Sequence, residues 1–165
     1  MKEKMKRLLF ELINNSKNSD RNIAKILGVS QPTVTRMRKK LEEKAIVEYT
    51  VTPNLTELGY ELMAVTFVST IGSVKSEVER KEALKKCEKW MMEQPNIVFA
   101  CDGNGMGMDG MMISIHKDYT DFLGLITKLR TEWSETLGEI RTFVSSIKGG
   151  VVLKPYSLKY LEKVT

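Results

Sequence analysis

Residues 22–41 read NIAKILGVSQPTVTRMRKKL, and this stretch predicts two short helices joined by a tight turn. Ser19 is a suitable N-cap for the first helix, with Asp20 in its first turn, and Gly28 is suited to end it. Ser30 can cap the second helix, and Pro32 fits its first turn, where a missing backbone N–H costs nothing. Two helices so close together indicate a helix-turn-helix, which places its second helix in the DNA major groove.

The second helix has an apolar side and a basic side. At about 100° per residue, Val34, Met37 and Leu41 lie together, and Pro32, Arg36 and Lys39 lie opposite them. A recognition helix reads base edges mainly from its first turns and holds phosphates with its flanking cations. We therefore assign base-edge contacts to Gln31, Thr33, Thr35 and Arg36, and phosphate contacts to Lys39 and Lys40. The alternative interpretation is an ordinary basic helix that faces solvent.

The residues around this motif complete a small basic domain. A third helix is predicted by an apolar stripe at helical spacing, made of Met5, Leu8, Leu9, Leu12 and Ile13. Residues 45–51 are rich in apolar and β-branched types and predict the strand or wing of a winged helix-turn-helix. Residues 1–50 contain 12 Lys and Arg against 6 Asp and Glu, a net charge of +6, while the whole chain carries +5. Only this part is basic, so we expect it to bind a polyanion.

Composition excludes several other classes of protein. The 165 residues, 42% of them hydrophobic, are enough for one medium domain or two small ones. Cys87 and Cys101 show no Cys-x-x-Cys spacing, so we interpret both as reduced and structural. No apolar run approaches the roughly 20 residues of a membrane span, and the N-terminus reads as a charged amphipathic helix instead of a signal peptide. We expect a cytoplasmic location.

The remainder of the chain predicts a second, α+β domain. Strands are expected at 62–70, 97–101, 111–115 and 140–147, and helices at 76–94 and from Asp118 to Trp133. The order β-α-β-β-α-β is the ferredoxin-like arrangement, in which both helices cover one face of a four-stranded antiparallel sheet. The predicted domains are therefore 1–52, a winged helix-turn-helix domain, 53–61, a linker, and 62–165, a ferredoxin-like domain for dimerisation.

The first of these strands is apolar on both of its faces. Met63, Val65 and Phe67 alternate with a second apolar set, Leu62, Ala64 and Val68. We therefore expect the sheet face that carries no helices to be covered and not left in water. The simplest cover is the same face of a second copy, which gives a two-fold homodimer and doubles the DNA half-sites.

The two-domain plan resembles the Lrp/AsnC family of bacterial and archaeal transcription regulators, and the match covers nearly the whole chain. The similar residues are Ile23-Ala24, Gly28-Val29-Ser30, Thr33-Val34-Thr35-Arg36, Leu41-Glu42-Glu43 and Ile46-Val47-Glu48-Tyr49. The helix-turn-helix alone is also similar to MarR-type proteins, so the second domain decides. The resemblance implies a transcription regulator that dimerises through its second domain, often forms tetramers or octamers, and binds amino-acid effectors near the loop between the second and third strands.

Three positions depart from the family pattern. A buried Ile of the recognition helix is Arg38 here, and we expect Met37 to fill the core while Arg38 lifts its charge outward. Ala45 replaces a Gly after that helix, at a cost of about 1 kcal/mol if a left-handed conformation is required. The third is the loop 102–110, where four glycines allow close approach to a ligand and two carboxylates could hold an α-amino group. These predict an effector site at Asp102, Gly103, Gly105 and Asp109, the alternative being a flexible connection without a ligand.

Two other functions remain open at this point. An enzyme is conceivable, because the siroheme decarboxylases share this plan and act on a tetrapyrrole. His116 is the single candidate ligand or base, and with no second His we interpret it as a surface or interface residue at a strand end. A DNA-organising protein with weak sequence preference is the other alternative, supported by the basic N-terminal arm. We expect a sequence-specific regulator of double-stranded DNA, with no catalytic residues, no metal and no cofactor.

Overall fold

The computed structural model describes residues 1–71, 77–149 and 152–163. The chain divides into two compact units, Met1–Thr52 with Lys154–Thr165, and Pro53–Leu153. Residues from Lys154 onward thus group with the first unit, whereas the sequence prediction counted them with the second domain. No helix in the described ranges is long and apolar enough to cross a membrane.

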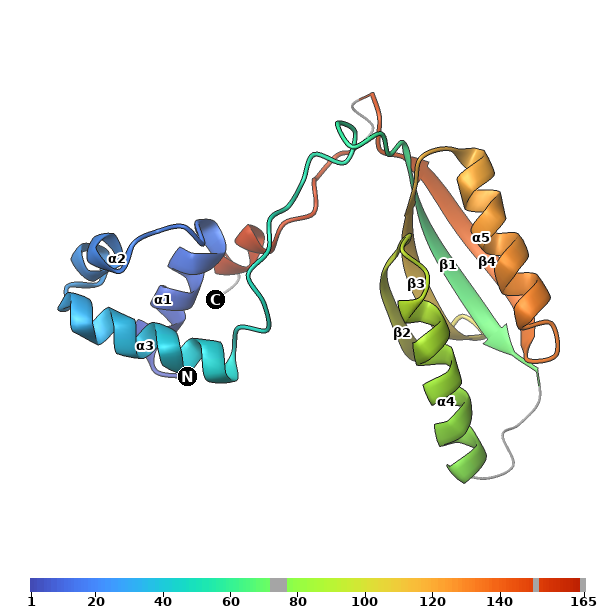
Figure 1. Ribbon diagram of the computed structural model, residues 1–165, viewed down its shortest axis with the longest axis horizontal. Coiled ribbons are helices and arrows are strands. Elements are labelled where there is room, and N and C mark those ends of the chain that lie inside the picture. The colour runs from blue at the N-terminus through green and yellow to red at the C-terminus, as the bar shows by residue number, and fades with distance from the viewer. Residues whose placement is uncertain (72–76, 150–151, 164–165) are drawn as a thin grey trace. The chain divides into compact units, whose positions relative to one another are not determined.

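The first unit consists of three helices and a short 3-10 helix (Figure 1). The helices are α1 (Glu3–Asn14), α2 (Asp20–Leu27) and α3 (Gln31–Lys44), and η1 (Leu158–Lys163) contacts α1. Their apolar stripes meet in one core, as the helical spacing predicts. The buried members are Leu8, Leu12, Ile23, Ala24, Leu27, Val34 and Leu41, with Met5, Leu9, Val29, Met37 and Ile46 packed around them. This core fixes α3 against the two preceding helices, so that its other side faces outward.

The turn between α2 and α3 forms largely as the sequence predicts. The Ser19 hydroxyl accepts a hydrogen bond from the Asn22 backbone N–H at 3.2 Å, and Gly28 ends α2 in the left-handed conformation with φ 61°. The cap of α3 is different, because the Ser30 side chain makes no hydrogen bond to the backbone of that helix. Its hydroxyl lies 2.8 Å from that of Thr33 instead. Ser30 therefore occupies the N-cap position, but the hydrogen bond expected of an N-cap side chain is not formed.

The predicted strand or wing at residues 45–51 is not formed in this chain. Residues 46–54 belong to no helix or strand, and Val47 is fully exposed. A lone β-type segment has no neighbouring strand to satisfy its backbone groups, so its composition alone cannot make a strand. Ala45 ends α3 with φ −136° and ψ −21°, so the cost expected for a left-handed residue does not arise.

The second unit is the predicted ferredoxin-like fold. Its elements are β1 (Leu62–Thr70), α4 (Glu77–Met92), β2 (Ile97–Gly105), β3 (Met108–His116), α5 (Tyr119–Glu132) and β4 (Leu137–Ser146). The strands form one antiparallel sheet in the order β2-β3-β1-β4. The Asp118 carboxylate caps α5 by accepting from the Asp121 N–H at 2.8 Å.

Both helices of this unit lie on the same face of the sheet (Figure 1). The core beneath them joins Trp90 of α4 and Leu129 of α5 to Ala64 and Met112 of the sheet. Successive residues of a strand point to opposite faces, so Val65 and Ile113, beside those two sheet residues, point away from the helices. The second face of the sheet therefore carries its own apolar side chains and no covering element among the described residues of the chain.

The glycine-rich stretch 102–110 is a β-hairpin and not the loop that its composition predicts. β2 continues to Gly105 and β3 begins at Met108, and these two residues pair. Only Met106 and Gly107 form the turn, with φ 55° and 73°. Two successive positive φ values are typical of the tight turn that matches the twist of paired strands. Glycines without a side chain were thus compatible with strand pairing, which the sequence pattern did not reveal.

Candidate nucleic-acid interface

The outer side of α3 presents most of the residues predicted to contact DNA. Gln31, Thr35, Arg36, Lys39 and Lys40 are exposed, and Thr33 is half-buried. Val34 and Leu41, on the other side, are at most 1% exposed. The structure therefore gathers the six assigned side chains around one helix, with cations toward its C-terminal half and hydroxyl and amide groups toward its N-terminus.

Two of the assigned hydroxyl groups have partners within the protein. The Thr33 hydroxyl is paired with that of Ser30, and the Thr35 hydroxyl lies 2.6 Å from an oxygen of the Asp20 carboxylate. Thr35 also lies 3.2 Å from the Gln31 carbonyl oxygen, one turn earlier in α3. Among the four residues assigned to base edges, Gln31 and Arg36 are those for which the structure gives no such side-chain bond.

Arg38 does not lift its charge outward, as we expected from the sequence. Its Nε donates to Asp20 at 2.8 Å and its Nη2 donates to the Asn18 carbonyl oxygen at 2.8 Å. Both charged side chains are 19% exposed. Burial lowers the pKa of Arg38, but hydrogen bonds to Tyr49 and Asp20 outweigh this, so that the pKa lies above its usual value. The sequence signal was Asp20 itself, which we interpreted only as a favourable charge at a helix N-terminus.

The sheet face without helices forms the second surface of interest. Phe99, Ile113, Val65 and Phe143 follow one another in register across all four strands, from β2 to β4. Phe99 is 50% exposed and Phe143 is 70% exposed. Met63, Phe67, Met111 and Ile115 extend this row on both sides. We call these eight residues the open sheet face, and they form the contiguous apolar patch that the sequence predicts.

The predicted effector residues lie on the hairpin of β2 and β3. Gly103 and Gly105 belong to β2, and Asp102 pairs in register with Gly110. Asp109 is tied to the end of β1, because its Oδ2 accepts from the Thr70 backbone N–H at 2.7 Å and from the Thr70 hydroxyl at 2.8 Å. These bonds hold the pKa of Asp109 below its usual value, so the carboxylate is ionised at neutral pH.

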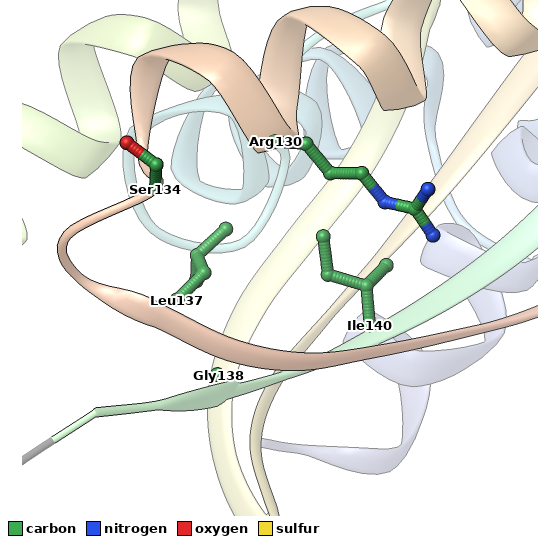
Figure 2. Close-up of a pocket in the computed structure, with 5 residues that line it drawn as sticks. All are labelled: Arg130, Ser134, Leu137, Gly138 and Ile140. Atoms are coloured by element: carbon green, nitrogen blue, oxygen red, sulfur yellow. The ribbon is translucent and has the colours of Figure 1, made fainter.

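A cavity lies near the same end of the sheet, between the end of α5 and the start of β4 (Figure 2). Its volume is about 300 Å³. The side chains of Arg130 and Ser134 line one side, and Leu137, Gly138 and Ile140 of β4 line the other. A Cβ at Gly138 would lie 2.9 Å from the Ser69 hydroxyl oxygen, so a larger residue there would have to displace that side chain. Figure 2 shows the Arg130 guanidinium and the Ser134 hydroxyl at opposite ends of this lining. A guanidinium is suited to a carboxylate, so this cavity competes with the hairpin as a place for a small ligand.

His116 is a buried core residue and not the surface or interface residue that its strand-end position predicts. Its side chain is 0% exposed, and its ring nitrogens lie 2.8 Å from the Ser114 hydroxyl and 3.3 Å from the Asn96 amide. Burial lowers the pKa of His116, although the nearby Asp121 carboxylate acts in the opposite direction. A ring enclosed in this way has no open side for an axial ligand or a substrate. Within the described ranges, no group of three His, Cys, Asp or Glu residues could hold a metal ion.

Comparison with known proteins places this arrangement among transcription regulators. A family model described as winged helix-turn-helix DNA-binding matches residues 1–48. The HTH-type transcriptional regulator LrpA of Pyrococcus abyssi is 40% identical over 80 residues, which are 48% of this chain and 57% of that protein. The chain thus spans little more than half the length of this relative.

Solved structures match the chain over nearly its whole length. An AsnC family transcriptional regulator from Agrobacterium tumefaciens has a TM-score of 0.77 at 15% identity, and the match covers 98% of this chain and 99% of that one. The transcriptional regulator NMB0573 from Neisseria meningitidis, solved as an L-Met complex, has a TM-score of 0.75 at 15% identity, with 96% and 95% covered. At such identities the likeness concerns the fold alone.

The sequence comparison and the fold comparison both find proteins of the Lrp and AsnC type. The match to LrpA covers about half of this chain, whereas the solved structures match nearly all of it. The matched proteins are named as transcriptional regulators and not as enzymes, in agreement with the expectation from the sequence. The resemblance is therefore confirmed: residues 1–48 match a winged helix-turn-helix model, and the two-part fold is that of solved AsnC family regulators.

Proposed function

We propose that this protein is a sequence-specific transcription regulator that binds double-stranded DNA through α3. The observation that supports this most is the outward side of α3, where Gln31, Arg36, Lys39 and Lys40 are exposed beside a buried apolar side. Base-edge donors near the helix start and cations further along are the arrangement of a recognition helix. The basic charge of residues 1–50 supplies attraction to phosphates.

We further propose that the protein acts as a homodimer joined through the open sheet face. An exposed row of aromatic and aliphatic side chains across four strands is costly in water, and a two-fold copy of the same face removes it from solvent. A dimer presents two copies of α3, which suits a DNA site with two half-sites about one helical turn apart. Tetramers and octamers, which the family resemblance implies, would add further contacts between dimers.

Two substitutions on α3 separate base reading from phosphate binding. We expect Arg36→Ala to weaken binding by about 1–3 kcal/mol and to relax the preference at one base position in each half-site. Lys39→Ala should weaken binding equally for all sequences and lower the slope of log K against log salt by about one unit. Titrations of selected and random duplexes at several salt concentrations measure both quantities. Lys117→Ala, an exposed cation of the second unit, is the matched control and should change neither.

Absence of binding to any duplex at low salt would contradict the proposed function. Equal affinity for selected and random duplexes would contradict the sequence-specific part of it and favour a DNA-organising protein. Specific regulators typically prefer their site by at least about 10³-fold.

We also propose an amino-acid effector, bound at the hairpin by Asp102, Gly103, Gly105 and Asp109. The support is the ionised Asp109 carboxylate beside exposed strand ends, and the L-Met complex of the Neisseria meningitidis regulator. Calorimetric titration with each of the twenty amino acids should find one that binds, and Asp109→Asn should weaken it at least about tenfold, since an ion pair with the α-amino group is lost. Unchanged binding in Asp109→Asn, with loss in Arg130→Ala, would move the effector to the cavity beside β4 and contradict this placement.

A further inference from the structure

A polar cluster joins the start of α2 to the flank of α3, beside the side that we propose contacts DNA. The Asp20 carboxylate uses both of its oxygens there, Oδ1 for Arg38 at 2.8 Å and Oδ2 for Thr35 at 2.6 Å. Arg38 also donates to the Asn18 carbonyl oxygen. Further along α3, Glu42 accepts a hydrogen bond of 2.9 Å from the Tyr49 hydroxyl. The cluster therefore links α3 to the residues before and within the first turn of α2.

The Asp20 bonds hold α3 in one rotational setting. Asp20 and Arg38 are each 19% exposed, so their ion pair is shielded from water more than a typical surface pair. Charge-assisted hydrogen bonds are stronger than neutral ones and restrict geometry. Arg38 and Thr35 lie three residues apart on α3, so two bonds to one carboxylate resist rotation of the helix about its axis.

The same bond determines what Thr35 can offer to a base. The Thr35 hydroxyl donates its single hydrogen to the Asp20 carboxylate. The second neighbour, the Gln31 carbonyl oxygen, is also only an acceptor. Thr35 is exposed, yet it has no hydrogen left to donate to a purine N7 or O6. Two parts of Thr35 remain available, its methyl group and a hydroxyl oxygen that can now only accept. The methyl group has one apolar partner in the major groove, the C5-methyl group of thymine.

We propose that Asp20 is a positioning residue for the recognition helix and that it makes Thr35 a reader of the thymine methyl group. This inference rests on the proposed DNA-binding function and specifies one base that α3 recognises. The same carboxylate keeps Arg38 on the protein, so that this cation does not bind phosphate. The base-edge contact assigned to Thr35 from the sequence is thus specified as an apolar contact with the thymine methyl group.

The test compares thymine with deoxyuridine, which lacks only the C5-methyl group. A duplex is first selected from a random library with the unchanged full-length protein, and each of its thymines is then replaced singly by deoxyuridine. One position per half-site should lose about fourfold in affinity, which corresponds to the burial of one methyl group. Thr35→Val keeps the branched methyl and should show the same loss. Thr35→Ser keeps the bond to Asp20 without the methyl, and should bind both duplexes equally.

The role of Asp20 has a separate measurement. Asp20→Asn removes the charge that holds Arg38, so the salt slope should increase by about one unit as Arg38 reaches a phosphate. Glu43→Gln is the matched control, because it removes one exposed carboxylate of α3, and it should leave the slope unchanged. Equal slopes for these two variants would contradict the positioning role.

The outcomes separate this inference from the proposed function. If the unchanged protein selects a motif but no thymine shows the loss, or Thr35→Ser retains it, the thymine contact is wrong while DNA binding stands. If the unchanged protein selects no motif, the proposed function fails and the inference fails with it. Circular dichroism melting of each variant identifies any that do not fold. Thr35→Val and Thr35→Ser are conservative changes at an exposed position, so these two variants decide the test.

Discussion

Phe143→Asp is expected to convert the proposed homodimer into a monomer. Phe143 is 70% exposed in the single chain and stands in register with Val65, on the edge strand β4 of the open sheet face. An aspartate there would have to be buried without a partner if two such faces met, and a two-fold interface contains the change twice. Burying an unpaired charge in place of an aromatic side chain costs at least about 2 kcal/mol, so two copies weaken dimerisation on the order of 10³-fold. Sedimentation equilibrium measures the change in assembly.

The loss of the dimer should also reduce the affinity for a DNA site with two half-sites, because each α3 then binds alone. Leu123→Asp, on α5 and 44% exposed, is the matched control, since it places the same charge on the helix-covered side of the second unit. That variant should remain dimeric. A Phe143→Asp protein that sediments like the unchanged one would exclude the open sheet face as the interface.

Leu8→Ala is expected to unfold the first unit while the second stays folded. Leu8 is 0% exposed and lies in a core made only of residues from the first unit. Removing a fully buried leucine costs about 2–5 kcal/mol, which is comparable to the whole stability of a domain of this size. DNA binding should then disappear, because α3 loses the support of α1. Native-state hydrogen exchange should show protection lost in α1–α3 and retained in β1–β4.

Ile26→Ala is the matched control for this change. Ile26 lies on α2 in the same unit and is 46% exposed, so its truncation leaves no cavity of comparable size. We expect a small loss of stability and unchanged DNA binding. If Leu8→Ala instead removed protection from both units together, the two cores would have to be one cooperative structure, contrary to their separate composition.

The helices and the order of the second domain could be predicted because each depends on local patterns. The i, i+3, i+4 spacing around Leu8 and the left-handed Gly28 are properties of a few neighbouring residues. The alternation along β1 likewise predicted the open sheet face, since strand geometry alone decides which side chains share a face.

The errors concern contacts between residues far apart in the sequence. Asp20 and Arg38 are 18 residues apart, and nothing in the periodicity of either helix indicates their ion pair. His116 is enclosed by Asn96 and Asp121, which come from two other segments, so its burial could not be inferred from its place at a strand end. The segment 45–51 and the stretch 102–110 show the same limit, because a strand exists only where a neighbour pairs with it.

The two cores have no residue in common. Each half of the chain can therefore accept mutations under its own constraint, since packing couples substitutions mainly within one cluster. Over evolutionary time, the residues that we propose bind an operator can then change while those that we propose join subunits stay the same. Chimeras that exchange residues 1–52 between relatives should accordingly transfer the preference for a DNA site and leave the assembly partner unchanged.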